Sequence, residues 1–160
     1  MRLYGPRTNI ITRKRRLKTM TSTYFKLEEF LTSSTARQKS IENLPSWEVV
    51  DHLKELALFL DDLREKWGTG IKVSSGYRNE KLNSAVGGVS SSAHRVGYAA
   101  DLLPANGKFN EFVEFVKKWL QNKTFDQALI ETKGKTKWLH LSLRGVDGKQ
   151  RCMIKNLTVK

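Results

Sequence analysis

Apolar residues recur at helical spacing in two stretches of the chain. The longer stretch ends at Trp67, just before Gly68, and Pro45 with Ser46 favours a helix start ahead of it. Its apolar positions are three or four residues apart and would form one buried stripe: Val49, Leu53, Leu56, Leu60, Leu63 and Trp67. A second helix is predicted over residues 108–120, and its inward side chains are Phe109, Phe112, Val116 and Trp119.

Shorter apolar and alternating runs predict five strands, at residues 71–74, 99–103, 127–131, 137–143 and 151–157. The third and fourth strands are joined by a turn-like segment and therefore predict a hairpin. Helices that flank a mostly antiparallel sheet indicate an α+β fold. A chain of 160 residues is long enough to bury a core, and we predict a single domain over residues 20–160.

Histidine, aspartate, arginine, serine and glycine are concentrated in residues 74–101. Within this stretch His94 and Asp101 are seven residues apart, with Gly97 between them. The predicted strand over residues 99–103 would deliver Asp101. One imidazole and one carboxylate suit a divalent cation such as zinc. Two protein ligands hold zinc poorly, so we expect a third ligand from another part of the chain.

The third ligand is expected to be one of the two remaining histidines, His52 and His140. His140 lies in a strictly alternating strand, which places two sets of side chains on opposite faces: Leu139, Leu141 and Leu143 on one, and Trp138, His140 and Ser142 on the other. His52 lies among charged residues on the first predicted helix, where an ordinary surface position is the simpler interpretation. The sequence therefore favours His140 as the partner of His94 and Asp101.

Four spaced motifs occur in one order along the chain. They are Ser75-Gly76-Tyr77-Arg78, Leu82-Asn83-x-x-Val86-Gly87-Gly88, Ser92-x-His94-x-x-Gly97-x-Ala99-x-Asp101 and Trp138-x-His140. Together they resemble the D-alanyl-D-alanine carboxypeptidase and endopeptidase family of zinc metallopeptidases, which shares its fold with the hedgehog signalling domain. The likeness covers roughly Thr23 to Arg151, nearly the whole chain. It implies an α+β fold of the hedgehog and DD-peptidase type.

The resemblance also implies a catalytic zinc site. One zinc ion per chain would be held by His94, Asp101 and His140, with a fourth position left for water. Zinc lowers the pKa of a bound water to about 7 and polarises the scissile carbonyl. By the same resemblance, Arg78 would hold the carboxylate or carbonyl of the substrate, and Ser92 would hydrogen-bond its backbone. The alternatives are a structural salt bridge for Arg78 and an ordinary loop position for Ser92.

The general base is the point at which the chain departs from the family it resembles. Many members carry Glu or Asp three residues before the last histidine, where this chain has Lys137, and a protonated lysine cannot accept a proton. Glu131 is the nearest replacement, because it ends an apolar strand that should pair with the strand of His140. We take Glu131 as the candidate catalytic residue, and the alternative is an acid on the hairpin surface.

Basic residues are in excess and unevenly distributed. The net charge is +13, and residues 1–19 hold seven of the 29 Lys and Arg residues and no acidic residue. We interpret residues 1–19 as a disordered basic leader that lacks the apolar run of a signal peptide. No stretch is apolar and long enough to span a membrane. Basic surfaces attract polyanions, so an anionic cell-wall polymer is a candidate partner, and nucleic acid is a less favoured one. The single cysteine, Cys152, excludes an internal disulfide and is predicted to be a buried thiol in the last strand.

Three functions are compatible with these patterns. The first is a monomeric zinc peptidase, a carboxypeptidase or endopeptidase, that cuts peptidoglycan stem peptides or cross-bridges containing D-amino acids. Such an enzyme would be made in the cytoplasm and act on the cell wall, as a phage endolysin or after export by another route. The second is a non-catalytic zinc-binding domain of the same fold, used for cell-wall or protein binding, which Lys137 favours. The third is a basic nucleic-acid-binding domain, which the leader favours and the His-Asp-His set does not.

Overall fold

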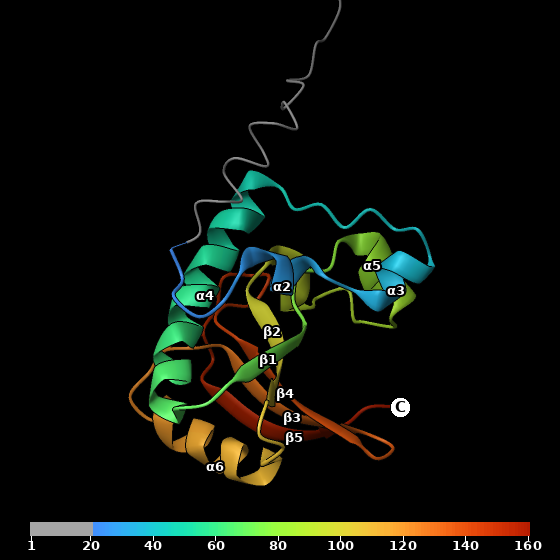
Figure 1. Cartoon of the computed structure of the whole chain (residues 1–160). Helices are drawn as coiled ribbons and strands as arrows, with labels where there is room; N and C mark the ends of the chain where they lie inside the picture. Colours follow the sequence, from blue (N-terminus) through green and yellow to red (C-terminus); the bar gives the residue numbers. More distant parts are fainter. Residues whose placement is uncertain (1–20) are drawn as a thin grey trace, which may run out of the picture.

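The computed structural model describes residues 21–160, so the predicted basic leader over residues 1–19 lies outside the described residues (Figure 1). The helices are α2 (Leu27–Leu31), α3 (Ser34–Gln38), α4 (Trp47–Trp67), α5 (Glu80–Ala85), the 3-10 helix η1 (Ala93–Val96) and α6 (Phe109–Leu120). The strands are β1 (Ile71–Ser75), β2 (Ala99–Pro104), β3 (Gln127–Lys133), β4 (Thr136–Ser142) and β5 (Met153–Thr158). Within residues 21–160, no helix is both long and apolar enough to cross a membrane.

The five strands form one mixed sheet in the order β1-β2-β4-β3-β5. Every neighbouring pair is antiparallel except β3 and β5, which run parallel. Helices α4 and α6 pack their apolar sides against one face of this sheet (Figure 1). The predicted α+β class with a mostly antiparallel sheet is thus confirmed.

Helix α4 has the apolar stripe that its sequence predicts, and it begins after Pro45 rather than with Pro45 in its first turn. Its N-terminus is capped by Ser46, whose side chain accepts a hydrogen bond from the backbone N–H of Val49. Gly68 ends the helix in the left-handed conformation, with φ of 81°. The predicted stripe is buried as far as Leu63. Trp67 is half-buried and packs its ring against two phenylalanines of α6, with centroid distances of 5.3 and 5.2 Å.

Helix α6 completes the core and is tied to α4 by a polar contact. Phe112, Val116 and Trp119 are buried as predicted, whereas Phe109 is only partly buried. The indole Nε1 of Trp119 donates to Oδ2 of Asp62 on α4 at 2.7 Å. This bond satisfies the one polar atom of the large buried ring of Trp119 and joins the two helices.

Two details of the C-terminal part differ from the sequence predictions. The β3–β4 hairpin is longer than predicted and turns at Gly134, whose φ is 58°. Cys152 precedes β5 and is exposed, so the prediction of a buried thiol within the last strand is wrong. The reason is that β5 is the edge strand of the sheet and pairs with β3 alone, so most of its side chains face solvent.

Candidate metal centre

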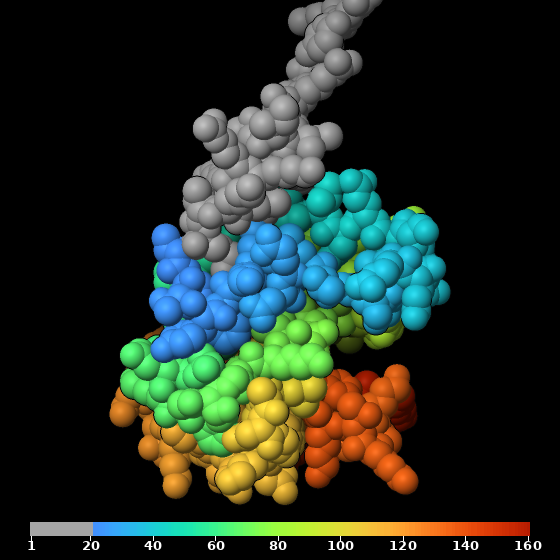
Figure 2. Space-filling model, in the orientation of Figure 1, coloured from blue at the N-terminus to red at the C-terminus, as the bar shows by residue number. Residues whose placement is uncertain are grey.

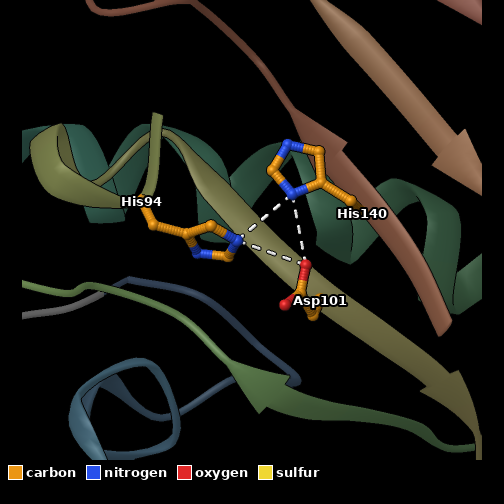
Figure 3. Close-up of side chains that lie close together, drawn as sticks. All are labelled: His94, Asp101 and His140. Atoms are coloured by element: carbon orange, nitrogen blue, oxygen red, sulfur yellow. Dashed lines mark hydrogen bonds and ion pairs between the residues drawn. The ribbon is translucent and has the colours of Figure 1, made fainter. Parts of the chain in front are cut away.

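The three predicted ligands meet on the face of the sheet that α4 and α6 leave uncovered (Figure 3). Asp101 on β2 and His140 on β4 are cross-strand partners. His94 reaches them from η1. Its Nε2 lies 3.2 Å from Oδ1 of Asp101 and 3.1 Å from Nδ1 of His140, and the last two atoms are 3.2 Å apart. All three side chains are buried, so the polar cluster is sheltered from bulk water.

The spacing and chemistry of these donors fit a zinc ion. A tetrahedral ion with bonds of about 2.0–2.1 Å keeps neighbouring donors roughly 3.3 Å apart. The observed separations of 3.1–3.2 Å therefore need little adjustment to hold such an ion. Two imidazole nitrogens and a carboxylate oxygen are also donors that zinc accepts. A set of three protein ligands leaves one coordination position open, as in catalytic zinc sites.

A hydrogen bond to the backbone orients the imidazole ring of His94. Its Nδ1–H donates to the carbonyl oxygen of Gly76 at 2.6 Å, so its Nε2 presents a lone pair to the other two ligands. A side chain at Gly76 would place its Cβ 2.4 Å from the carbonyl oxygen of Phe30, which only glycine avoids. Burial lowers the pKa of His94 and so favours the neutral imidazole that a metal requires. Burial alone would raise the pKa of Asp101, but the adjoining histidines lower it well below its usual range.

The 3-10 helix that carries His94 is held at both ends. At its start, the hydroxyl oxygen of Ser92 accepts a hydrogen bond from the His94 backbone N–H at 3.3 Å. At its end, Gly97 adopts φ of 80° and lies so close to α4 that an added Cβ would be 2.9 Å from Cγ1 of Val49. Glycine is therefore required at position 97 both for its conformation and for the close approach of α4.

His52 has a supporting position that the sequence prediction missed. It is half-buried rather than on the open helix surface, and its Nδ1–H donates to the carbonyl oxygen of Val96 at 2.7 Å. Its ring stacks on Tyr98 with centroids 4.0 Å apart. Position 52 is three residues from Val49 and four from Leu56, which could have placed it at the edge of the buried stripe. His52 thus braces η1 but does not belong to the metal-binding group.

The metal-binding group opens into a cleft of about 620 Å³. In Figure 2 this side of the molecule is hollowed between the green segment around α5 and the orange β3–β4 hairpin. Arg78, Ser92 and Glu131 all line the cleft, so the structure brings the predicted substrate-binding and catalytic candidates next to the predicted ligands.

The register of the β3–β4 hairpin separates Glu131 from Lys137. Leu129 pairs with His140, and Glu131 pairs with Trp138, so Glu131 and His140 project from the same face of the sheet. Lys137 is an odd number of residues from His140 and projects from the opposite face, where it lines other hollows. Lys137 therefore lies outside the cleft, although it occupies the position where the family pattern has an acid.

The cleft contains one buried donor without a hydrogen-bond partner. It is Nε of Arg78, which has no such partner among residues 21–160. Arg78 also makes no ion pair within 4.0 Å of a carboxylate in these residues. Burial lowers the pKa of Arg78, against the effect of Asp101 and Glu131. Burial raises the pKa of Glu131, and Asp101 adds to the rise against the effect of His140 and Arg78.

Ser142 projects from the same face of the sheet as His140 but forms a hydrogen bond within the sheet. Its hydroxyl oxygen accepts a hydrogen bond from the backbone N–H of Gln127 at 3.1 Å, which satisfies a fully buried side chain. Ser142 is absent from the set of residues that line the cleft. Its position on the ligand-bearing face therefore follows from strand alternation rather than from contact with the metal-binding group.

Comparison with known proteins identifies the family. The family model of Peptidase M15 matches residues 23–142, which is three quarters of the chain and includes every predicted site residue. No curated protein gives a significant match to the sequence. The matched segment contains the His94, Asp101 and His140 group, whose geometry suits a metal ion. The chain therefore belongs to the Peptidase M15 family, whose members are zinc-dependent peptidases.

Proposed function

We propose that this protein is a zinc peptidase that hydrolyses peptide bonds in peptidoglycan stem peptides or cross-bridges. The observation that carries the proposal is the buried His94, Asp101 and His140 group, which opens into a cleft that also holds a carboxylate and a guanidinium. The choice of substrate follows the resemblance of the four sequence motifs to D-alanyl-D-alanine peptidases. The place of action proposed for it is the cell wall.

Glu131 is assigned the role of general base. When bound by the three ligands, zinc would supply an acidified water and polarise the scissile carbonyl. The Glu131 carboxylate takes a proton from the attacking water and returns it to the leaving amine as the C–N bond breaks. Two features support this role: Glu131 projects from the same face as His140, and burial raises the pKa of its carboxyl group. A raised pKa makes the carboxylate a better proton acceptor near neutral pH.

Arg78 and Ser92 are assigned to substrate binding. The half-buried side chain of Arg78 has a buried, unpartnered Nε in the cleft, and a planar fork suits a carboxylate or a carbonyl of the substrate. A substrate oxygen that accepts from this group would satisfy a donor that residues 21–160 leave unpaired. The Ser92 side chain caps η1 and also lines the cleft, so its hydroxyl hydrogen remains free to donate to the substrate backbone.

Substitution of Glu131 by glutamine tests the proposal. Glutamine keeps the size of the side chain and removes its basicity, so cleavage should fall roughly a hundred- to ten-thousand-fold while zinc content stays unchanged. Purified peptidoglycan would be digested and its products identified by mass spectrometry. Lys137→Ala is the matched control, because Lys137 is a neighbour on the paired strand that projects away from the cleft, and it should cleave at nearly the parent rate. Parent-rate cleavage by Glu131→Gln would assign the proton transfer to another group.

A non-catalytic zinc-binding domain is the second candidate function. The specific observation in its favour is Lys137, which stands where the family pattern has an acid. On this alternative the cleft would bind a peptide of the cell wall or of a protein without cutting it. A parent protein that retains zinc but cleaves no peptidoglycan preparation would establish this second function in place of the first.

A further inference from the structure

A second concave surface lies beside α6, outside the metal cleft. It consists of two hollows of about 470 and 510 Å³, which share Phe109, Asn110 and Lys137. Both hollows lie between α6 and the β3–β4 hairpin. In Figure 2 the yellow segment that follows β2 and the orange hairpin border this region. The hollow of about 510 Å³ shares no described lining residue with the metal cleft, so a ligand bound in it would not occupy that cleft.

Unpaired positive charge surrounds this surface. Lys72 on β1, Lys135 in the hairpin turn and Lys137 on β4 line the same hollow, and we call these three residues the lysine face. All three are exposed, and none lies within 4.0 Å of a carboxylate oxygen belonging to residues 21–160. The only described carboxylate that lines either hollow is that of Glu114, which is already paired with Lys117 at 2.8 Å.

Such an arrangement favours an anionic ligand. Like charges placed around a hollow repel each other, and a concave wall of low dielectric concentrates their field on whatever enters it. A lysine ammonium is a compact charge with three donors, which suits a phosphate group and tolerates many approach angles. The remaining lining includes Leu103, Pro104 and Phe109, which offer apolar contact to the carbon skeleton of a ligand.

We propose that the lysine face binds a flexible phosphodiester polymer of the cell wall, of the polyol-phosphate type. The choice of a wall polymer rests on the proposed function, because an enzyme acting on the wall would meet such a chain beside its peptide substrate. Single-stranded nucleic acid fits less well. Single strands are held by stacking on exposed aromatic rings, and Phe109, the only aromatic residue among those described that line the hollows, is partly buried.

The two binding surfaces would then act together. No described residue lines both the metal cleft and the hollow of the lysine face, so the polymer and the peptide can be bound at the same time. Attachment to a polymer that is fixed in the wall raises the local concentration of the peptide bonds to be cut. The proposal also gives Lys137 a function that its position away from Glu131 allows.

Binding of the full chain to fluorescently labelled poly(glycerol phosphate) tests the proposal without any need for catalysis. Anisotropy would be measured over a series of salt concentrations for the parent and for a variant with Lys72→Ala, Lys135→Ala and Lys137→Ala. We expect the variant to bind about tenfold or more weakly. Its log–log salt slope should fall by roughly 2, at about 0.7 for each lost phosphate contact on a flexible chain. Zinc content, and cleavage of soluble peptidoglycan fragments that carry no wall polymer, should be unchanged.

A second triple variant controls for the loss of net charge. Lys26, Lys39 and Lys81 are exposed lysines that line neither hollow, and their replacement by alanine removes the same charge. This control should retain affinity within about threefold of the parent. Thermal unfolding of both variants would be measured first, and Lys135→Glu, a single charge reversal in the exposed turn, would repeat the test.

Three results would overturn the proposal. The first is failure of the parent to bind the polymer, and the second is an equal loss of affinity in the two triple variants. The third is loss of duplex DNA binding in the lysine-face variant while polymer binding is retained, which would assign the surface to nucleic acid. Because none of these measurements depends on cleavage, a failure of the proposed peptidase activity would be seen separately.

Discussion

Replacing Gly97 with alanine should damage both the stability of the fold and the metal site. Gly97 ends η1 with φ of 80°, and an added Cβ would lie 2.9 Å from Cγ1 of Val49 and 3.0 Å from its carbonyl oxygen. The backbone oxygen belongs to α4 and cannot rotate out of the way. The strain must therefore be relieved by moving η1, which carries His94.

The size of the effect can be estimated from two contributions. An alanine in the left-handed conformation costs about 1–2 kcal/mol, and overpacking against a fixed neighbour adds about 1–3 kcal/mol. Gly97→Ala should therefore reduce the free energy of unfolding by roughly 2–5 kcal/mol. Gly107→Ala is the matched control, because Gly107 has φ of 74° and nothing within 4 Å of an added Cβ. It should lose only the conformational part, about 1–2 kcal/mol.

Two measurements separate these contributions. Urea unfolding of the metal-free proteins gives the difference in stability between the two variants, and competition with a chromophoric chelator gives their zinc affinities. We expect the larger loss of stability and a weakened zinc affinity in Gly97→Ala alone. Equal destabilisation of the two variants, with parent zinc affinity in both, would show that the contact with α4 does not position His94.

Three further predictions concern metal binding, substrate binding and acid stability. His94→Ala and His140→Ala should each lose the one zinc ion per chain expected of the parent, as metal analysis after gentle purification can determine, and stoichiometric zinc in both would refute the ligand assignment. Arg78→Lys keeps the charge but not the planar fork, so it should lower turnover of peptidoglycan fragments at least about tenfold with unchanged zinc content. Burial acts to raise the pKa of Asp62, but hydrogen bonds from Trp119 and two lysines hold it well below its usual range. Ionised Asp62 therefore stabilises the fold fully above about pH 4, and this contribution is lost as the pH falls through the folded-state pKa. Asp62→Asn should reduce the dependence of the thermal unfolding temperature on pH in the acid range. An unchanged dependence would contradict the assignment.

Local periodicity was enough to predict the parts of the fold that depend on one segment at a time. Helix α4 followed from its apolar stripe and its stop at Gly68, because each of these acts within a few residues. The face of His140 followed from strict alternation, since a strand has no other way to orient successive side chains. Alternation likewise indicates that Lys137 and His140 face opposite ways.

The site depended on how distant segments meet. Spacing and residue type identified His94, Asp101 and His140 as ligands, but their separations of 3.1–3.2 Å result from pairing β2 with β4 and placing η1 against α4. The sequence placed Glu131 on a strand beside that of His140. Its position in the cleft, and the upward shift of its pKa, come from the hairpin register and from burial.

Other features lay beyond the reach of any local pattern. Cys152, which directly precedes the edge strand β5, is exposed. The edge position of β5 results from its pairing with β3, a strand from another part of the sequence. The contact of His52 with Val96 and the grouping of Lys72 with Lys137 around one hollow are of the same kind. Periodicity determines which way a side chain points within its own helix or strand. Its neighbours from other elements are determined by tertiary packing. The reason is that apolar burial is non-directional, so several different elements could cover the same apolar stripe.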